Sequence, residues 1–414
     1  MRLRCPNDHA HRSFSTSLEF RVVTTLTLRK ILLIAVLVPL ALAGGWWYFH
    51  ERSLPATGPR YREYAYITNG KSNTVTVIDL RTFQPIRNLQ VGAEPTGVAA
   101  NPKRNEIYVV NAGSNNVTII DAEQNKVVAT IGVHGRPYFV DVSPDGHRAY
   151  VANSGSANLS VLDLDRRTVA ATLQVGVAPG LARVSPDGLT VVVTNRADNT
   201  VSLIDASRPA VRSTINVCMN PEDVAILPDS TKAFISCSAP SQVASIDLKR
   251  DKLLALLDVG KSPVGLALKP DGGELFTCNF GADSVSVIET TPNEVLSSLL
   301  IGTEPVRAVV SLDNSRLYVS NFGANTVAVY DIDLGRVIAV LPVGTHPDAL
   351  ALSQSQNYLL VLNSGSGDVA VIQKRRPRKL EPSEYSLLTI IPVGMQPNQI
   401  VVKAFLATKL ADGR

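Results

Sequence analysis

The chain has 414 residues, of which 45% are hydrophobic and 18% are charged. This balance excludes intrinsic disorder, and the length exceeds that of one ordinary core unless the architecture is modular. The net charge of +4 is small for this length and gives no sign of a nucleic-acid-binding surface. The 27 glycines and 25 prolines predict many tight turns, and therefore many short strands.

Residues 31–48 form an uncharged run of the length needed to cross a bilayer core, and its end carries Trp46, Trp47 and Tyr48. Basic residues precede this run, so residues 1–30 are expected in the cytosol and the rest of the chain outside it. A cleaved signal sequence is the alternative, because an A-x-A site ends at Ala43. Both interpretations predict that the protein acts in the periplasm or outside the cell. In the first, residues 31–48 anchor it in the inner membrane and residues 49–60 form a linker. In the second, it is secreted after cleavage.

Three markers then recur with a period of 42 residues. The first is a strand ending of the type Y-V-x-N, with Cys237 in place of Asn in one copy, which ends at residues 69, 111, 153, 195, 237, 279, 321 and 363. The second is a link of the type V-G-x-x-P, which ends at prolines 95, 137, 179, 221, 263, 305, 347 and 397. The third is a strand ending in an acidic residue or Gln, at positions 79, 121, 163, 205, 247, 289, 331 and 373.

Each unit reads as four antiparallel strands without helical periodicity, which is typical of a β-propeller blade. The first unit, 61–91, lacks its first strand, and the segment 397–403 supplies only that strand. We therefore predict an all-β propeller of eight four-stranded blades over 61–403, closed by the two ends of the chain, with a tail at 404–414. Seven blades with a surplus hairpin are the alternative.

The Asn-ending strands, the S-P-D-G turns such as 143–146 and the V-G-x-x-P links resemble the YVTN family of β-propeller repeat proteins over residues 61–403. The resemblance implies an extracytoplasmic propeller, and it implies no defined activity, since many members of the family have none. The chain lacks the Trp-Asp pairs of WD-type repeats. Both of its tryptophans fall within 31–48, which argues against the Trp-rich blades of quinone-cofactor propellers. No cofactor is predicted.

Alternation along the first strand of each blade places the side chains two and four residues after the link proline in the central channel. Small residues are expected where these strands converge, and five positions depart from that pattern: Asp141, Arg183, Asp223, Arg307 and Gln399. Asp141 and Arg183 lie in adjacent blades and predict an ion pair. We call the side of the ring that carries the marker asparagines and the link prolines the top face. Tyr138, Glu222 and His346 are expected on it, around the mouth of the channel.

These residues predict a polar ligand-binding site at the top mouth, although a water-filled channel also tolerates charge. No short catalytic motif is present, and the two histidines in links, His134 and His346, are too far apart in a ring of eight to share a metal. The preferred function is a non-catalytic module that binds a ligand or a protein. The alternatives are a lyase- or lactonase-type enzyme, a cofactor-binding propeller and a structural surface protein.

Two cysteines replace repeat markers. Cys218 takes the place of the link Gly, and Cys237 takes that of the following marker Asn, so both fall on the top face and predict a disulfide in an oxidising compartment. The eight extra residues before Pro397 include a basic stretch at 374–379. This stretch is a candidate for an anionic partner, with a solvated loop as the alternative.

Overall fold

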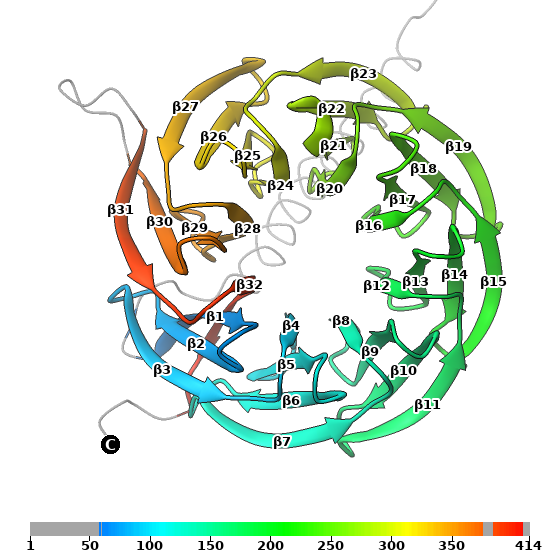
Figure 1. The fold of residues 1–414 in the computed structure, drawn as a ribbon, viewed down its shortest axis with the longest axis horizontal. Coiled ribbons are helices and arrows are strands. Elements are labelled where there is room, and N and C mark those ends of the chain that lie inside the picture. The colour runs from blue at the N-terminus through cyan, green and yellow to red at the C-terminus, as the bar shows by residue number, and fades with distance from the viewer. Residues whose placement is uncertain (1–57, 59, 376–383, 409–414) are drawn as a thin grey trace, which may run out of the picture. The chain divides into compact units, whose positions relative to one another are not determined.

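The computed structural model describes residues 58, 60–375 and 384–408, and residues 57–414 form one compact unit. The described residues form a ring of eight antiparallel sheets with four strands each (Figure 1). The predicted anchor at 31–48 lies outside the described residues. Among those described, no helix is long and apolar enough to cross a membrane. A 3-10 turn, η1, spans Phe280–Ala282.

Each blade runs from a strand at the channel to a strand at the rim (Figure 1). The channel strands are β4 (Pro95–Ala100), β8 (Pro137–Val142), β12 (Pro179–Val184), β16 (Pro221–Ile226), β20 (Pro263–Leu268), β24 (Pro305–Val310), β28 (Pro347–Leu352) and β32 (Pro397–Leu406). The second strands are β5 (Glu106–Asn111), β9 (Arg148–Asn153), β13 (Thr190–Asn195), β17 (Lys232–Cys237), β21 (Glu274–Asn279), β25 (Arg316–Asn321), β29 (Tyr358–Asn363) and β1 (Tyr61–Asn69).

The two remaining positions of each blade complete the sheet toward the rim. The third strands are β6 (Asn116–Asp121), β10 (Asn158–Asp163), β14 (Thr200–Asp205), β18 (Gln242–Asp247), β22 (Ser284–Glu289), β26 (Thr326–Asp331), β30 (Asp368–Lys374) and β2 (Thr74–Asp79). The rim strands are β7 (Lys126–Gly132), β11 (Thr168–Gln174), β15 (Ala210–Asn216), β19 (Lys252–Asp258), β23 (Glu294–Leu299), β27 (Arg336–Pro342), β31 (Tyr385–Pro392) and β3 (Gln84–Gln90).

The two ends of the propeller share one blade. β32 pairs antiparallel with β1 from Tyr61 opposite Leu406 to Asn69 opposite Pro397. The prediction of eight blades is therefore confirmed, and the seven-blade alternative is wrong. β32 continues beyond Lys403 to Leu406. This pairing leaves the ring without an open blade at either end.

The register explains why the repeat markers recur together. Each link proline lies opposite the marker residue of its own blade, as Pro95 lies opposite Asn111 and Pro221 opposite Cys237. Both markers therefore lie on the top face, as predicted. The second and third strands are buried on both sides between neighbouring blades, and tyrosines such as Tyr66 and Tyr108 are completely enclosed there. Stacking of the blades thus supplies the core that a single four-stranded sheet cannot form.

Candidate functional site

The eight channel strands surround an axial cavity of about 430 Å³. All five channel residues that the sequence singled out line it: Asp141, Arg183, Asp223, Arg307 and Gln399. The rest of the wall is mainly apolar and includes Phe139, Leu181 and Leu266. A cavity of this size with several convergent polar groups has the character of a small-molecule site.

Asp141 on β8 does not form the expected ion pair with Arg183. Its Oδ1 accepts a hydrogen bond from the backbone N–H of Val142 at 3.0 Å, and its Oδ2 accepts one from Val184 of the next blade, also at 3.0 Å. A channel strand pairs with a neighbour on one edge only, so N–H groups on its other edge need partners of this kind. Burial raises the pKa of Asp141, and the charge of Arg183 and the two N–H groups offset part of that shift.

Asp223 on β16 repeats this arrangement in another blade. Its carboxylate accepts hydrogen bonds from Val224 N at 2.8 Å and from Leu266 N of the next blade at 3.1 Å. Arg307 lies beside it, with Nη1 at 3.8 Å from Asp223 Oδ2 and at 2.9 Å from the carbonyl oxygen of Val264. Burial acts to lower the pKa of Arg307, but the carboxylates of Asp223 and Asp348 raise it overall. The ion pair of the channel thus involves Asp223 and Arg307.

The top mouth is narrowed by Tyr138, Arg196 and Glu222. The Arg196 guanidinium lies 4.2 Å from the centre of the Tyr138 ring, and its Nε lies 3.7 Å from Glu222 Oε2. These three residues line a hollow of only about 50 Å³, which shares Phe139, Leu181, Arg307 and Gln399 with the axial cavity. The larger space is therefore inside the channel, below the mouth where the sequence placed the site.

His346 is not part of the cavity wall. Its imidazole is exposed and stacks on Phe322, with ring centres 4.3 Å apart and planes 7° from parallel. Among the described residues, no group of three or more potential ligands could hold a metal ion. Of the basic stretch at 374–379, Lys374 and Arg375 are described, and the other residues lie outside the description.

Some polar side chains of the cavity already have hydrogen-bond partners within the protein, and others do not. The carboxylates of Asp141 and Asp223 both bond to the backbone of two blades. By contrast, the Arg183 guanidinium lies 4.6 Å from the centre of the Phe139 ring and has no hydrogen bond or ion pair within the described part of the chain. The side-chain amide of Gln399 likewise has no hydrogen-bond partner among those residues. The cavity therefore offers the free guanidinium of Arg183 and the free amide of Gln399, whereas each oxygen of the two carboxylates already accepts a hydrogen bond.

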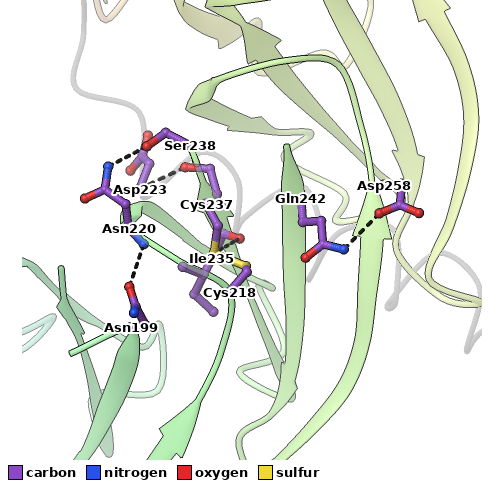
Figure 2. Close-up of a disulfide and its surroundings, with 10 residues drawn as sticks. Asn199, Cys218, Asn220, Asp223, Ile235, Cys237, Ser238, Gln242 and Asp258 are labelled. Carbon is purple, nitrogen blue, oxygen red and sulfur yellow. Dashed lines mark hydrogen bonds between the residues drawn. A yellow bond between two sulfur atoms is a disulfide. The ribbon is translucent and has the colours of Figure 1, made fainter. Parts of the chain in front are cut away.

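Cys218 and Cys237 form a disulfide with a Cα–Cα distance of 5.6 Å, and both are buried (Figure 2). The bond joins the link before β16 to the end of β17. Figure 2 shows Asp223 close by, where its backbone N–H donates to Ser236 Oγ at 3.0 Å. The disulfide thus restrains the segment after Cys218, which carries Glu222 at the mouth and Asp223 in the channel.

Sequence reasoning missed two features of this site. It did not foresee that Arg196 would cover Tyr138, although Arg196 follows a marker Asn where most blades have Gly, Ala or Ser. It also did not single out Phe139, whose ring supports Arg183. Arg196 is a large side chain at a position that is mostly small in the repeat, and that departure was the available signal. The position of Phe139 varies from Gly to Arg among the blades and gave no such signal.

The ring, its closure and its axial cavity define an eight-bladed β-propeller with a central pocket. Residues 33–186 match the family of YNCE-like beta-propellers, which agrees with the resemblance to YVTN repeats. No functionally curated protein matches the sequence.

Several solved structures are similar in fold. Hydrazine synthase of Kuenenia stuttgartiensis aligns with a TM-score of 0.54 and 23% identity, over 64% of this chain and 91% of that one. The dihydro-heme d1 dehydrogenase NirN, solved in complex with DHE, aligns with a TM-score of 0.67 and 16% identity, over 84% of this chain and 77% of that one. A functionally unknown protein from Desulfotomaculum acetoxidans aligns with a TM-score of 0.57 and 15% identity, over 82% and 98%. At these identities the likeness concerns the fold alone.

Proposed function

We propose that this propeller is a non-catalytic binding module whose ligand is a small anion held in the axial cavity. The observation that carries the proposal is Arg183, a guanidinium that lines the cavity and has no hydrogen bond or ion pair among the described residues. Guanidinium groups bind carboxylates in a bidentate manner, and these charge-assisted hydrogen bonds are among the strongest in proteins. Gln399 adds neutral donors to the same wall.

The arrangement of the carboxylates favours binding over catalysis. A general acid or base must reach the substrate, but Asp141 and Asp223 are each held by two backbone N–H groups. The similar structures include two named enzymes, and an enzyme on this scaffold is the alternative. A structural surface protein is the second alternative, and ligand binding in the channel would argue against it.

Ligand titration of the purified full chain in detergent tests the proposal. Acetate, succinate and inorganic phosphate are the anionic probes, and putrescine is the cationic control. We expect at least one anion to bind saturably, and Arg183→Gln to weaken that binding tenfold to a hundredfold, as the loss of charge-assisted hydrogen bonds implies. Arg166→Gln, which removes an exposed guanidinium paired with Asp163, should leave the affinity unchanged. Equal affinity in the Arg183 variant, or binding of putrescine alone, would contradict the proposal.

We further propose that the module works in the periplasm or outside the cell, as the uncharged run at 31–48 indicates. A disulfide between Cys218 and Cys237 suits an oxidising compartment. Alkaline phosphatase fused after Arg414 should be active in a bacterial host, because that enzyme matures only after export. An inactive phosphatase fusion, together with an active cytosolic reporter at the same position, would contradict this location.

A further inference from the structure

The rim strand β19 carries exposed leucines between two opposite charges. Its residues read K-L-L-A-L-L-D, and no charged residue lies between Lys252 and Asp258. Leu254 and Leu256 are 43% and 44% exposed. The rim strand β23, which neighbours β19 in the ring (Figure 1), adds Leu296, which is 51% exposed, so both adjacent rim strands have exposed apolar side chains. A charge within the strand interrupts β3 at Arg87 and β15 at Arg212, and none does so in β19 or in the other five rim strands.

The strand is also complementary to itself. If two copies of β19 run antiparallel with Ala255 opposite Ala255, then Leu254 lies opposite Leu256 and Lys252 lies opposite Asp258. Among the eight rim strands, β19 alone carries opposite charges at its two ends. Lys252 has no hydrogen bond or ion pair within the described chain, and the exposed Asp258 carboxylate accepts one hydrogen bond from Gln242 at 2.9 Å. Both charges are therefore available to a partner.

We propose that a second copy of this chain docks on the rim, with β19 of each copy paired antiparallel across a two-fold axis at Ala255. A rim strand has no partner on its outer edge, so its backbone groups are free to extend the sheet into another chain. The same patch then serves both copies, as a two-fold interface requires. All eight rim strands carry a β-bulge at the equivalent position, so the bulge does not distinguish β19. The opposite charges at its two ends do, since β31 also exposes Leu387, Leu388 and Ile390 but has no charge at either end.

Cysteine crosslinking tests the position of the axis. In a Cys5→Ser background, Ala255→Cys places a thiol opposite its own counterpart, because directly opposed residues of paired strands have Cβ atoms about 5 Å apart. The matched control is Ala129→Cys, at the same repeat position in β7. With the full chain in detergent under mild oxidation, we expect a reducible dimer from Ala255→Cys and at least tenfold less from Ala129→Cys. Equal crosslinking at both positions, or none at position 255, would overturn the proposal.

A charge swap tests the pairing without relying on a new thiol. Lys252→Asp places two carboxylates opposite each other at both ends of the paired strands. This change should raise the dimer dissociation constant roughly tenfold, since two cross-strand pairs turn from attraction to repulsion. The double variant Lys252→Asp/Asp258→Lys should restore the wild-type constant. Sedimentation of the full chain in detergent measures all three proteins. A monomeric wild-type protein at all concentrations, or a double variant as weak as the single one, would refute the interface.

Discussion

In most blades the link before the first strand is joined to the end of the second strand, and we call this contact the junction. The blade of β16–β19 forms its junction by different chemistry from the other blades. In six blades the link Gly packs against the marker Asn, so closely that a Cβ added to Gly92 would lie 2.7 Å from the Cβ of Asn111. In the blade of β16–β19 a disulfide takes the place of this Gly–Asn contact. The remaining blade keeps Asn153 and has His134 at the link position. Seven of the eight blades thus join the link to the second strand, six by a Gly–Asn contact and one by a disulfide.

The marker Asn also needs partners on the third strand. Nδ2 of Asn195 donates to Thr200 Oγ1 and Ser202 Oγ, both at 2.9 Å. In the disulfide blade, the residue at the position of Ser202 is Ala244, which offers no acceptor. Alanine is not confined to the disulfide blade at this position, since Ala328 and Ala370 occupy it in two blades that keep the marker Asn. In those blades the Asn amide donates to Thr326 or to Asp368. The hydroxyl at this position is therefore one of two possible partners of a marker Asn, and its absence is not tied to the disulfide.

Removing the disulfide should give the largest effect. We expect Cys218→Ala/Cys237→Ala to lower the free energy of unfolding by about 3 kcal/mol, because the bond closes a short loop of the unfolded chain. Urea unfolding followed by circular dichroism measures the loss. A reducing agent should lower the wild-type stability by a similar amount and leave the variant unchanged. A wild-type midpoint that is insensitive to reductant would show that the bond contributes nothing.

Crowding the Gly–Asn contact should have the next largest effect. Gly260→Ala would bring a Cβ to 2.6 Å from Asn279 Cγ, and overpacking of this kind costs about 2 kcal/mol. The matched control is Gly132→Ala, because no atom lies within 4 Å of a Cβ added there. Thermal unfolding should show a lower midpoint for the first variant and no loss for the second. Equal midpoints would mean that the close approach is not needed.

Removing one partner of a marker Asn should cost less. Ser202→Ala deletes an acceptor for the buried Asn195 amide, and we expect a loss of about 1 kcal/mol in the free energy of unfolding. Ala244→Ser in the wild-type background supplies the same hydroxyl where no Asn needs it. Because Ala244 is completely buried and faces no marker Asn, the added hydroxyl should not raise the free energy of unfolding. An unchanged free energy of unfolding in Ser202→Ala, or a gain from Ala244→Ser, would contradict the assigned role of the hydroxyl.

The smallest effect should come from restoring the common junction. Cys218→Gly/Cys237→Asn recreates the Gly–Asn pair. The new Asn then lacks an acceptor like the one that Ser202 supplies to Asn195 in the preceding blade. Adding Ala244→Ser should raise the free energy of unfolding by roughly 1 kcal/mol or less. Urea midpoints of the two proteins, measured with reductant present, give the difference. If the added serine lowers the stability, the new Asn does not use its hydroxyl.

The repeat markers predicted the fold because each one is a local signal with a fixed period. They specified the strands, the number of blades, the closure by the segment after Pro397 and the face shared by Asn111 and Pro95. The channel was predictable as a set of residues, since alternation along a strand decides which side chains face it. Their partners were not, because the free backbone of Val184 competes with Arg183 for Asp141. That competition depends on the spacing between blades, which no marker encodes.

The closing blade has a consequence for biosynthesis. β1 begins at Tyr61, and its partner strand ends at Leu406, so almost the whole chain is translated before the two can meet. A ribosome that stops early releases a product whose first sheet has an exposed edge, however well its other sheets have formed. Quality-control proteases can therefore distinguish finished from unfinished copies by one feature, the absence of the last strand to leave the ribosome.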